Sequence, residues 1–388
     1  MKQNHALLVM DEGSAAHKIY RLVFGLLIAG FAIWLPHFNE DFRVGQFTKA
    51  MAFMVAVIGL NLIIGYSGLL SLGTSAFMGM GAYIGAILVQ DFNWDYWQTL
   101  PIAILACFVA GVILGIPSLR IKGLYLAVVT LSLAVTFPTI LKMEVKVPGF
   151  YGGELTVGEF TGGANGKKVR EKIIAPEWLG WMPGIDNQEF YVYYINLAFL
   201  AGSIWVARNL IKSRPGRAII AIRDNETGAA VSGVNLPLYK TMTFGVSAGF
   251  AAVAGIMYLM EVKFVSADTD FNLGLAILLL AGLVVGGVGT LESAIPAGLL
   301  MVFVPWRTSN IRVVESLPGK GPVAALGPLF FGLLLIVLTF VMPGGIVAGI
   351  KRVWNYLFVV RPVPPKITAG EALTASPTAG VPTVAAEV

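Results

Sequence analysis

Residues 50–90 read AMAFMVAVIGLNLIIGYSGLLSLGTSAFMGMGAYIGAILVQ and contain 41 positions without Asp, Glu, Lys or Arg. A bilayer-spanning helix needs about 20 apolar residues, because about 30 Å of hydrocarbon must be crossed at 1.5 Å per residue. The stretch is therefore long enough for two spans. We expect the helix to break at residues 65–68 (GYSG) and again at residues 71–75 (SLGTS), where glycine and hydroxyl side chains gather.

The same pattern recurs along most of the chain. Further uncharged runs cover residues 22–39, 96–119, 123–141, 191–207, 241–260, 271–291, 293–306 and 321–350. With two spans in residues 50–90, these runs predict about ten transmembrane helices. The run at 22–39 has no small-residue cleavage site after its apolar core, so we expect a retained helix rather than a signal peptide. The short run at 293–306 can extend backwards through Glu292.

The composition agrees with this pattern. Charged residues make up 13% of the chain, whereas soluble domains carry about 25%. Apolar residues make up 56%, and the mean hydropathy is +0.77. These values exclude a water-soluble globular enzyme. The single cysteine, Cys107, excludes an internal disulfide, and the three histidines lie near the N-terminus. The sequence therefore predicts an all-α integral membrane protein that binds no metal.

Charge in the connecting segments orients the spans. With both termini inside, the inner segments hold 15 Lys and Arg residues and the outer segments hold 12. We therefore expect residues 1–19 to be a cytosolic segment and residues 20–350 to form the transmembrane domain. That domain would contain an outer loop at 142–189 and a cytosolic loop at 208–240. Residues 351–388 are rich in Pro, Ala, Thr and Gly and are expected to form a largely disordered cytosolic tail.

The broken segment is the candidate translocation pathway. Non-helical backbone at membrane depth is tolerated only where protein buries it or where it lines a cavity. The candidate pathway residues are Asn61, Tyr66, Ser67, Ser71, Thr74, Ser75, Phe77, Gly81 and Tyr83. Small residues also let helices approach closely in lipid. For this reason we assign helix packing to Gly79, Gly85, Gly286, Gly287 and Gly289.

The basic loop at residues 214–240, RPGRAIIAIRDNETGAAVSGVNLPLYK, is the second informative segment. Asp224 or Asn225 is suited to cap a short helix that stops at Gly233. Ala218, Ile219 and Ile222 form an apolar patch at helical spacing. The pattern leaves two interpretations open, a helix lying on lipid head groups and a helix that docks a cytosolic partner.

Several kinds of site are missing from the sequence. No ionisable residue lies convincingly at mid-membrane, which disfavours coupling to protons or sodium. No catalytic motif occurs in the chain, and we interpret the acidic pairs Asp91/Asp95 and Asp268/Asp270 as solvated loop charges. The glycine-rich GGANGKK at residues 162–168 does not satisfy the Walker A pattern. If ATP drives transport, another chain must hydrolyse it.

Four stretches carry a resemblance to a known family. Residues 61–83, NLIIGYSGLLSLGTSAFMGMGAY, resemble the first signature of permease subunits of branched-chain amino-acid ABC importers, the LivM-like family. The stretch GRAIIAIRDNE at 216–226 resembles a second signature, and VVGGVGT at 284–290 resembles a third. TGGANG at 161–166 is a weaker fourth match in the outer loop.

The resemblance implies an importer of several subunits in the bacterial plasma membrane. This chain would be one of two related permease subunits that move branched-chain or related amino acids inward by alternating access. Two cytosolic ATP-binding subunits would use ATP and Mg, and an extracytoplasmic solute-binding protein would deliver the solute. The chain itself would bind no cofactor. The residues that couple to the ATPase would be Arg217, Arg223, Asn225, Glu226, Ala229, Ala230 and Gly233.

Other functions stay open at this point. The same importer class also serves urea, short amides and small organic acids. A stand-alone secondary carrier or channel would transport without any ATPase chain. A membrane-embedded transferase or protease would need clustered carboxylates or histidines at a membrane face.

Overall fold

A computed structural model describes most of the transmembrane part of the chain. The described residues are 8–11, 30–38, 41–119, 123–143, 146–148, 154–169, 188–309, 332–333, 336–337, 340–342 and 344–361. The chain divides into two units. Met1–Ala32 with Lys351–Val388 form one, and Ile33–Ile350 form the other. About half of each predicted span at 22–39 and 321–350 lies outside the described residues, as do residues 120–122.

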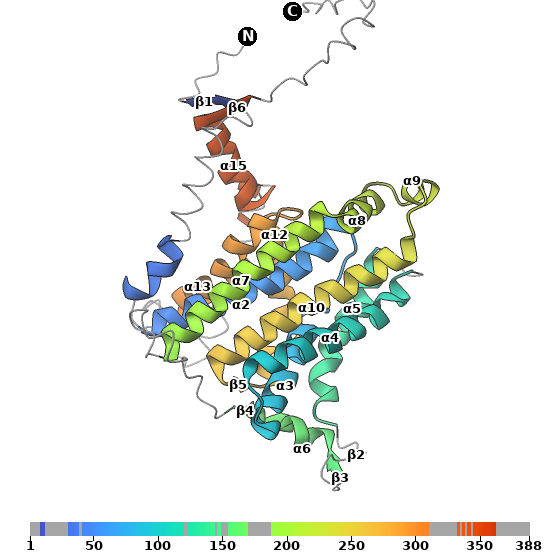
Figure 1. Cartoon of the computed structure of the whole chain (residues 1–388), viewed down its shortest axis with the longest axis vertical. Helices are drawn as coiled ribbons and strands as arrows, with labels where there is room; N and C mark the ends of the chain where they lie inside the picture. The colour runs from blue at the N-terminus through green and yellow to red at the C-terminus, as the bar shows by residue number, and fades with distance from the viewer. Residues whose placement is uncertain are drawn as a thin grey trace, which may run out of the picture. The chain divides into compact units, whose positions relative to one another are not determined.

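Helices dominate the Ile33–Ile350 unit (Figure 1). The longer ones are α2 (Asp41–Asn61), α3 (Thr74–Phe92), α4 (Tyr96–Gly115), α5 (Leu124–Ile140), α7 (Gln188–Lys212), α10 (Leu236–Val262), α12 (Leu273–Gly286) and α13 (Ala294–Ser309). The shorter ones are α6 (Val157–Thr161), α8 (Arg214–Asp224), α9 (Glu226–Val231) and α11 (Ala267–Asp270), with 3-10 turns at Leu35–Phe38, Pro117–Leu119, Gly163–Asn165 and Leu291–Ser293.

Five helical stretches of the described chain are long and apolar enough to cross a bilayer. They are Arg43–Tyr66, Tyr96–Leu119, Gln188–Lys212, Leu236–Val262 and Ala267–Gly286, with a shorter apolar helix at Tyr125–Ile140. Several run beyond the uncharged stretches, because charged residues are tolerated where a helix reaches the membrane surface. The predicted total of ten spans stays a prediction.

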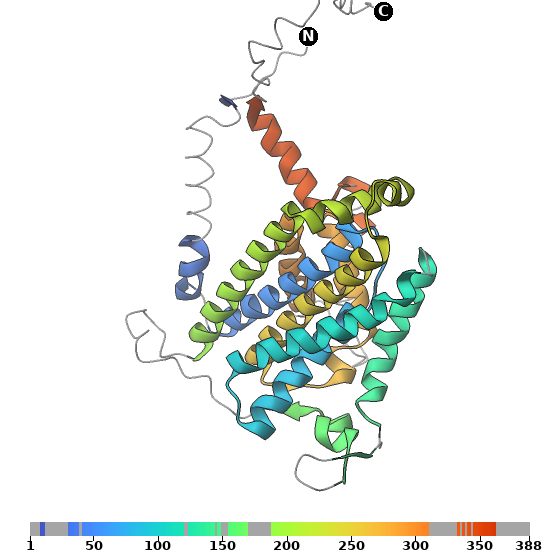
Figure 2. The ribbon, with the colours of Figure 1, turned by 45° about the vertical axis from the view of Figure 1, so that its right-hand side comes forward.

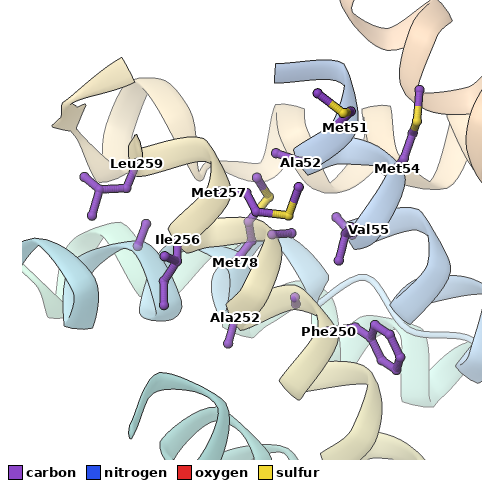
Figure 3. Close-up of a cluster of buried hydrophobic side chains, with 14 of the residues drawn as sticks. Met51, Ala52, Met54, Val55, Met78, Phe250, Ala252, Ile256, Met257 and Leu259 are labelled. Carbon is purple, nitrogen blue, oxygen red and sulfur yellow. The ribbon is translucent and has the colours of Figure 1, made fainter. Parts of the chain in front are cut away.

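The core lies around α2 and α10. In each, 78% of the apolar window is buried by neighbouring helices, whereas 33% is buried in the span that contains α4. Helix α10 packs against α2, α3 and α4. Figure 3 shows Met51 and Val55 of α2, Met78 of α3, and Ile256 and Met257 of α10 meeting in one cluster. Flexible methionines fill the gaps between these closely packed helices.

Glycines set the spacing of α10 from its neighbours. A Cβ atom at Gly81 of α3 would lie 2.5 Å from the Ala252 Cα, and one at Gly255 would collide with the Met78 carbonyl oxygen. Gly85 lies against Leu259 and Gly79 against Phe137. Gly79 and Gly85 therefore lie in close helix contacts, as expected of small residues in membrane proteins. Gly81, which we assigned to the pathway, also faces α10 rather than an open space.

The 41-residue uncharged run contains two helices joined by non-helical backbone. Helix α2 passes into a π-helical turn, η2 (Leu62–Tyr66), and α3 begins at Thr74. The turn closes with Ser67 N donating to the Leu62 carbonyl over 3.1 Å. Gly68 then adopts a left-handed conformation with φ +71°. Residues 67–73 lie between the two helices in irregular structure.

The helical unit has two distinct ends (Figures 1 and 2). Helices α8 and α9 lie at one end, beside the start of α10. Helix α6 and the small sheet of β4 (Lys167–Lys168) and β5 (Phe264–Val265) lie at the other, beside the end of α10. A second hairpin, β2 (Lys146–Pro148) with β3 (Glu154–Thr156), lies near α6.

The described chain is mainly helical, as expected of an integral membrane permease, and it also holds three two-stranded sheets. The expectation of a largely disordered tail at 351–388 stays a prediction, although regular structure continues past residue 351. Helix α15 (Gly345–Leu357) runs through this position, and β6 (Phe358–Arg361) pairs in parallel with β1 (Leu8–Asp11). Residues 362–388 lie outside the described part of the chain.

Candidate functional site

Three of the recognised sequence stretches meet where α2 ends. We define the helix-break junction as Asn61, Gly65, Gly68, Arg223 and the loop formed by residues 287–293. Asn61 is fully buried at the last position of α2. Its amide nitrogen donates to the Thr290 carbonyl over 2.7 Å and to the Ser293 hydroxyl over 3.3 Å. Its amide oxygen accepts from Gly289 N over 2.9 Å.

Glycine at position 65 makes this contact possible. A Cβ atom there would collide with the Asn61 amide oxygen and would lie 2.6 Å from Gly289 N. The turn that contains Gly65 is a π-helical segment, and such segments are frequent at functional sites in proteins. The Asn61 side chain thus joins the end of α2 to the loop that follows α12 by hydrogen bonds. Gly65 leaves the space that these bonds need.

Arg223 brings the basic loop to the same junction. It lies in the last turn of α8, and its Nη1 donates to the Gly65 carbonyl over 2.8 Å. Carbonyls at a helix C-terminus lack intrahelical partners and carry partial negative charge, so a guanidinium is a favourable partner. The Nε and Nη2 atoms bind Asp224 Oδ1 over 3.0 and 2.8 Å. A Cβ atom at Gly68 would lie 2.8 Å from Arg223 Cγ.

The structure contains the short helix expected in the basic loop. Between the two proposed capping residues it selects Asn225, whose Oδ1 accepts from Gly228 N over 2.8 Å. The helix ends in a Schellman motif at Gly233, which has φ +84°. There Val234 N donates to the Ala229 carbonyl and Gly233 N donates to the Ala230 carbonyl, each over 3.0 Å.

An ion pair ties this short helix to the core helix. Lys240 Nζ donates to Glu226 Oε1 over 2.6 Å, and the lysine side chain is only 5% exposed. Because a buried ammonium needs a partner, this pair fixes α9 against the first turns of α10. On the opposite face, Ala230 is exposed and Val231 is 86% exposed. An exposed valine on a polar loop is a feature that the sequence analysis missed.

The remaining predicted coupling residues take different positions. Arg217 is exposed, and its Nη1 donates to the Lys212 carbonyl over 2.9 Å. Ala229 is buried. Gly287 and Gly289, assigned to helix packing, instead follow the last residue of α12 and have φ values of +119° and +82°. Their role is to shape the loop, since residues with side chains rarely adopt these angles.

Most candidate pathway residues are buried in protein. The buried ones are Ser67, Ser71, Thr74, Ser75, Phe77 and Tyr83. The Tyr83 hydroxyl accepts from Ala267 N over 3.0 Å, and Ser75 Oγ is buried without a hydrogen-bond partner. In the break itself, Leu72 N donates to Thr130 Oγ1 over 2.9 Å. The break thus meets the membrane requirement by burial, and its role in translocation stays a prediction.

Tyr66 is the one candidate pathway residue that lines a cavity of about 310 Å³ near the junction. The cavity walls come from η2, α7, α8 and the first turns of α10. Elsewhere, the described residues contain no group of three His, Cys, Asp or Glu side chains that could hold a metal ion. The cavity surface is almost wholly apolar.

Three carboxylates of the two acidic pairs form hydrogen bonds or ion pairs. Asp91 accepts from Lys167 Nζ over 2.5 Å, and Asp268 pairs with Lys142. Asp270 accepts from the Tyr258 hydroxyl over 3.0 Å and from Ser266 N over 2.9 Å. Asp91 and Asp268 are partly exposed loop charges that pair with lysines, whereas Asp270 accepts two hydrogen bonds. They fasten the α6–β4–β5 end of the unit and do not form a catalytic pair.

Comparison with known proteins identifies the family. Residues 43–339 match the family described as branched-chain amino acid transport system / permease component. The chain belongs to this family. It is 31% identical over 297 residues to the high-affinity branched-chain amino acid transport system permease protein LivM of Escherichia coli K12, covering 76% of this chain and 69% of LivM. The LivM of Salmonella typhimurium is 30% identical over the same lengths.

A more distant relative also matches the chain. The autoinducer 2 import system permease protein LsrC of Salmonella paratyphi B is 22% identical and covers 74% of this chain and 76% of LsrC. No solved structure gives a significant match. Family membership and the apolar helices together establish a multi-pass membrane transport permease, which is a non-enzymatic component.

Proposed function

We propose that this chain is the membrane-spanning subunit of an ATP-driven importer for branched-chain or related amino acids. The partners would be a second permease subunit, two cytosolic ATP-binding subunits that use ATP and Mg, and an extracytoplasmic solute-binding protein. Both termini would be cytosolic. The family and the LivM relatives support the substrate class.

One contact carries the mechanistic part of the proposal. The hydrogen bond from Arg223 to the Gly65 carbonyl links α8, in the loop proposed to receive the ATPase, to the break in α2. The Glu226–Lys240 pair links α9 to α10 in the same way. A displacement of α8 and α9 would therefore act on the two most buried helices at once. Packed helices respond to such displacements by switching between discrete arrangements, as alternating access requires.

The exposed face of α9 supports docking over a purely lipid-bound loop. Thr227, Gly228 and Ala230 are exposed, as is Val231. These small side chains present a helix backbone that a protein groove can approach closely. The buried face, through Ala229, keeps the helix fixed to its own chain. Docking would thus transmit force through a rigid element rather than a flexible loop.

The test is transport by the complex purified from its native membrane and reconstituted in liposomes. We expect leucine uptake that requires ATP. Arg223→Gln should lower uptake by about tenfold or more while ATP hydrolysis continues, because a charge-assisted hydrogen bond contributes about 1.5–3 kcal/mol. The matched control is Arg208→Gln, an exposed arginine of α7 that has no assigned role in coupling.

Different failures identify different errors. Uptake without ATP by the chain alone would replace the proposal with a secondary carrier. ATP-dependent uptake that is indifferent to Arg223→Gln would keep the importer and reject the Gly65 link. Competition with valine, isoleucine, urea, acetamide and acetate decides the substrate class. Inhibition by urea or acetamide but not valine would move the chain to the alternative substrates of the same importer class.

A further inference from the structure

The apolar cavity lies where three candidate spans end. Leu62 and Tyr66 come from the end of the span Arg43–Tyr66, and Ile211 comes from the end of Gln188–Lys212. Met242 comes from the start of Leu236–Val262, and Ile219 of α8 closes one side. The cavity therefore lies at the level of one membrane surface. Its volume of about 310 Å³ is at the small end of the range for ligand pockets, about 300–1,000 Å³.

The chemistry of the walls excludes an amino acid as the occupant. A zwitterion would lose its hydration without gaining partners, since the exposed cavity surface is almost entirely carbon. The Thr243 hydroxyl, one of the few polar groups there, already donates to the Tyr239 carbonyl over 2.7 Å. Leu238 and Met242 are 50% and 44% exposed, so the cavity borders apolar protein surface. A hydrocarbon chain fits both the walls and this apolar border.

Three cationic residues adjoin the cavity lining in the sequence. Lys212, Arg214 and Arg217 are direct neighbours in sequence of the lining residues Ile211, Pro215 and Gly216, and all three are exposed. Within the part of the chain that the structure describes, no carboxylate lies within ion-pairing distance of them. Each basic residue near an anionic membrane surface contributes about 1 kcal/mol of attraction. The three cations therefore favour a phosphate beside an apolar cavity.

We propose that this cavity binds one acyl chain of an anionic phospholipid, with the lipid phosphate held by Lys212 and Arg214. The occupant would contact η2 through Leu62 and Tyr66 and α8 through Ile219. It would thus fill the space between the break in α2 and the helix that carries Arg223. The site shares Tyr66 with the candidate pathway, but the proposal does not depend on the importer proposal.

The test counts lipids on the intact complex after delipidation, by native mass spectrometry. Dioleoyl phosphatidylglycerol and dioleoyl phosphatidylcholine are the probes, because they share chains and differ in charge. We expect the anionic lipid to bind more tightly. The double variant Lys212→Gln/Arg214→Gln should weaken phosphatidylglycerol binding by about thirtyfold, to the level of the neutral lipid. Lys168→Gln, an exposed lysine at the opposite end, is the charge control.

Filling the cavity tests the acyl chain separately. Ile219→Trp should weaken binding of both lipids by about tenfold or more, since it displaces several buried methylenes. Ile113→Trp, at a 59% exposed position of α4, should have no effect. The proposal is overturned by equal binding of the two lipids to the wild type, by unchanged binding to Ile219→Trp, or by displacement of the lipid with leucine. None of these readouts requires transport activity.

Discussion

The two ends of the helical unit are stabilised by different kinds of interaction. At the α6 end, backbone pairing holds residues 167–169, with β4 and β5 in antiparallel register and Val169 N donating to the Lys263 carbonyl over 3.0 Å. The ion pairs of Lys167 with Asp91 and of Lys142 with Asp268 add to it. Most of these bonds join neighbouring segments at the same surface.

At the α8–α9 end, single charged side chains form the contacts with other elements of the unit. Arg223 bonds the carbonyl of Gly65, and Lys240 bonds Glu226. An apolar cavity lies beside these contacts. Helices α8 and α9 also pack through the buried Ile222 and Ala229. Because side-chain contacts beside a cavity rearrange more easily than paired strands, we expect the motion proposed above to enter at α8–α9.

The largest expected effect comes from the centre of the junction. Asn61→Leu removes three hydrogen bonds and leaves the half-buried Gly289 N without its partner, whereas the Thr290 carbonyl keeps the Ser293 hydroxyl at 2.6 Å. Each lost hydrogen bond contributes about 1 kcal/mol, so we expect a loss of about 3 kcal/mol. Thermal unfolding of the purified complex measures this loss. If the variant unfolds during purification, the yield of assembled complex from the membrane should fall below that of the wild type.

A second asparagine provides the control for this substitution. Asn196 of α7 is equally buried, but it makes one bond of 3.3 Å to the Met257 carbonyl, and its Oδ1 has no partner. Asn196→Leu should cost much less, because it also removes an unsatisfied acceptor. Equal destabilisation by the two changes would show that Asn61 is an ordinary buried amide and not the centre of a junction.

A matched pair of ion-pair variants compares the two ends directly. The Glu226 and Asp91 side chains are similarly exposed, at 35% and 34%, and each accepts from a largely buried lysine. Lys167 keeps the Phe160 carbonyl at 2.9 Å and the Phe160 ring when Asp91 is lost. Glu226 is the partner that Lys240 depends on. We therefore expect Glu226→Gln to cost about 2 kcal/mol and Asp91→Asn less than about 1 kcal/mol.

Melting temperature and uptake together sharpen this comparison. Glu226→Gln should lower both, whereas Asp91→Asn should leave uptake unchanged. The reverse order, with Asp91→Asn the more damaging to uptake, would place the moving end of the permease at α6 and contradict our assignment.

A smaller effect is expected where Arg223 packs on Gly68. Both Gly68 and Gly233 have left-handed φ angles, +71° and +84°. A Cβ atom at Gly233 meets nothing within 4 Å, whereas one at Gly68 meets the Arg223 stem at 2.8 Å. Gly233→Ala should therefore cost only the backbone strain of about 1 kcal/mol. Gly68→Ala should cost more and should also lower uptake, as transport assays on the two variants would show.

Much of the fold could be predicted from charge alone. The absence of charged residues in the stretch 50–90 predicted two helices, and its glycines and serines predicted irregular backbone between them. Capping chemistry predicted the short helix that ends at Gly233. These features follow from local rules of hydrophobicity and backbone conformation, which act within a few residues of chain.

The junction could not be predicted in the same way. Asn61 bonds a residue 228 positions away, and Arg223 bonds one 158 positions away. The sequence of the basic loop does not show that Lys240 is buried, because its partner Glu226 lies in another helix. We assigned Asn61 to the pathway and Gly289 to helix packing, although the two residues form one contact. Pairings set by the three-dimensional fold leave no periodic signal in a single sequence.

The smallest predicted effect concerns the exposed pair at the α6 end. The side chains of Lys142 and Asp268 are 37% and 46% exposed, so solvent screens their attraction. Asp268→Asn should change stability by less than about 1 kcal/mol, and the difference from wild type should shrink further at high salt. The melting temperature measured at low and high ionic strength checks both statements. A large, salt-independent loss would mean that this end depends on single ion pairs after all, and the contrast in how the two ends are held would then disappear.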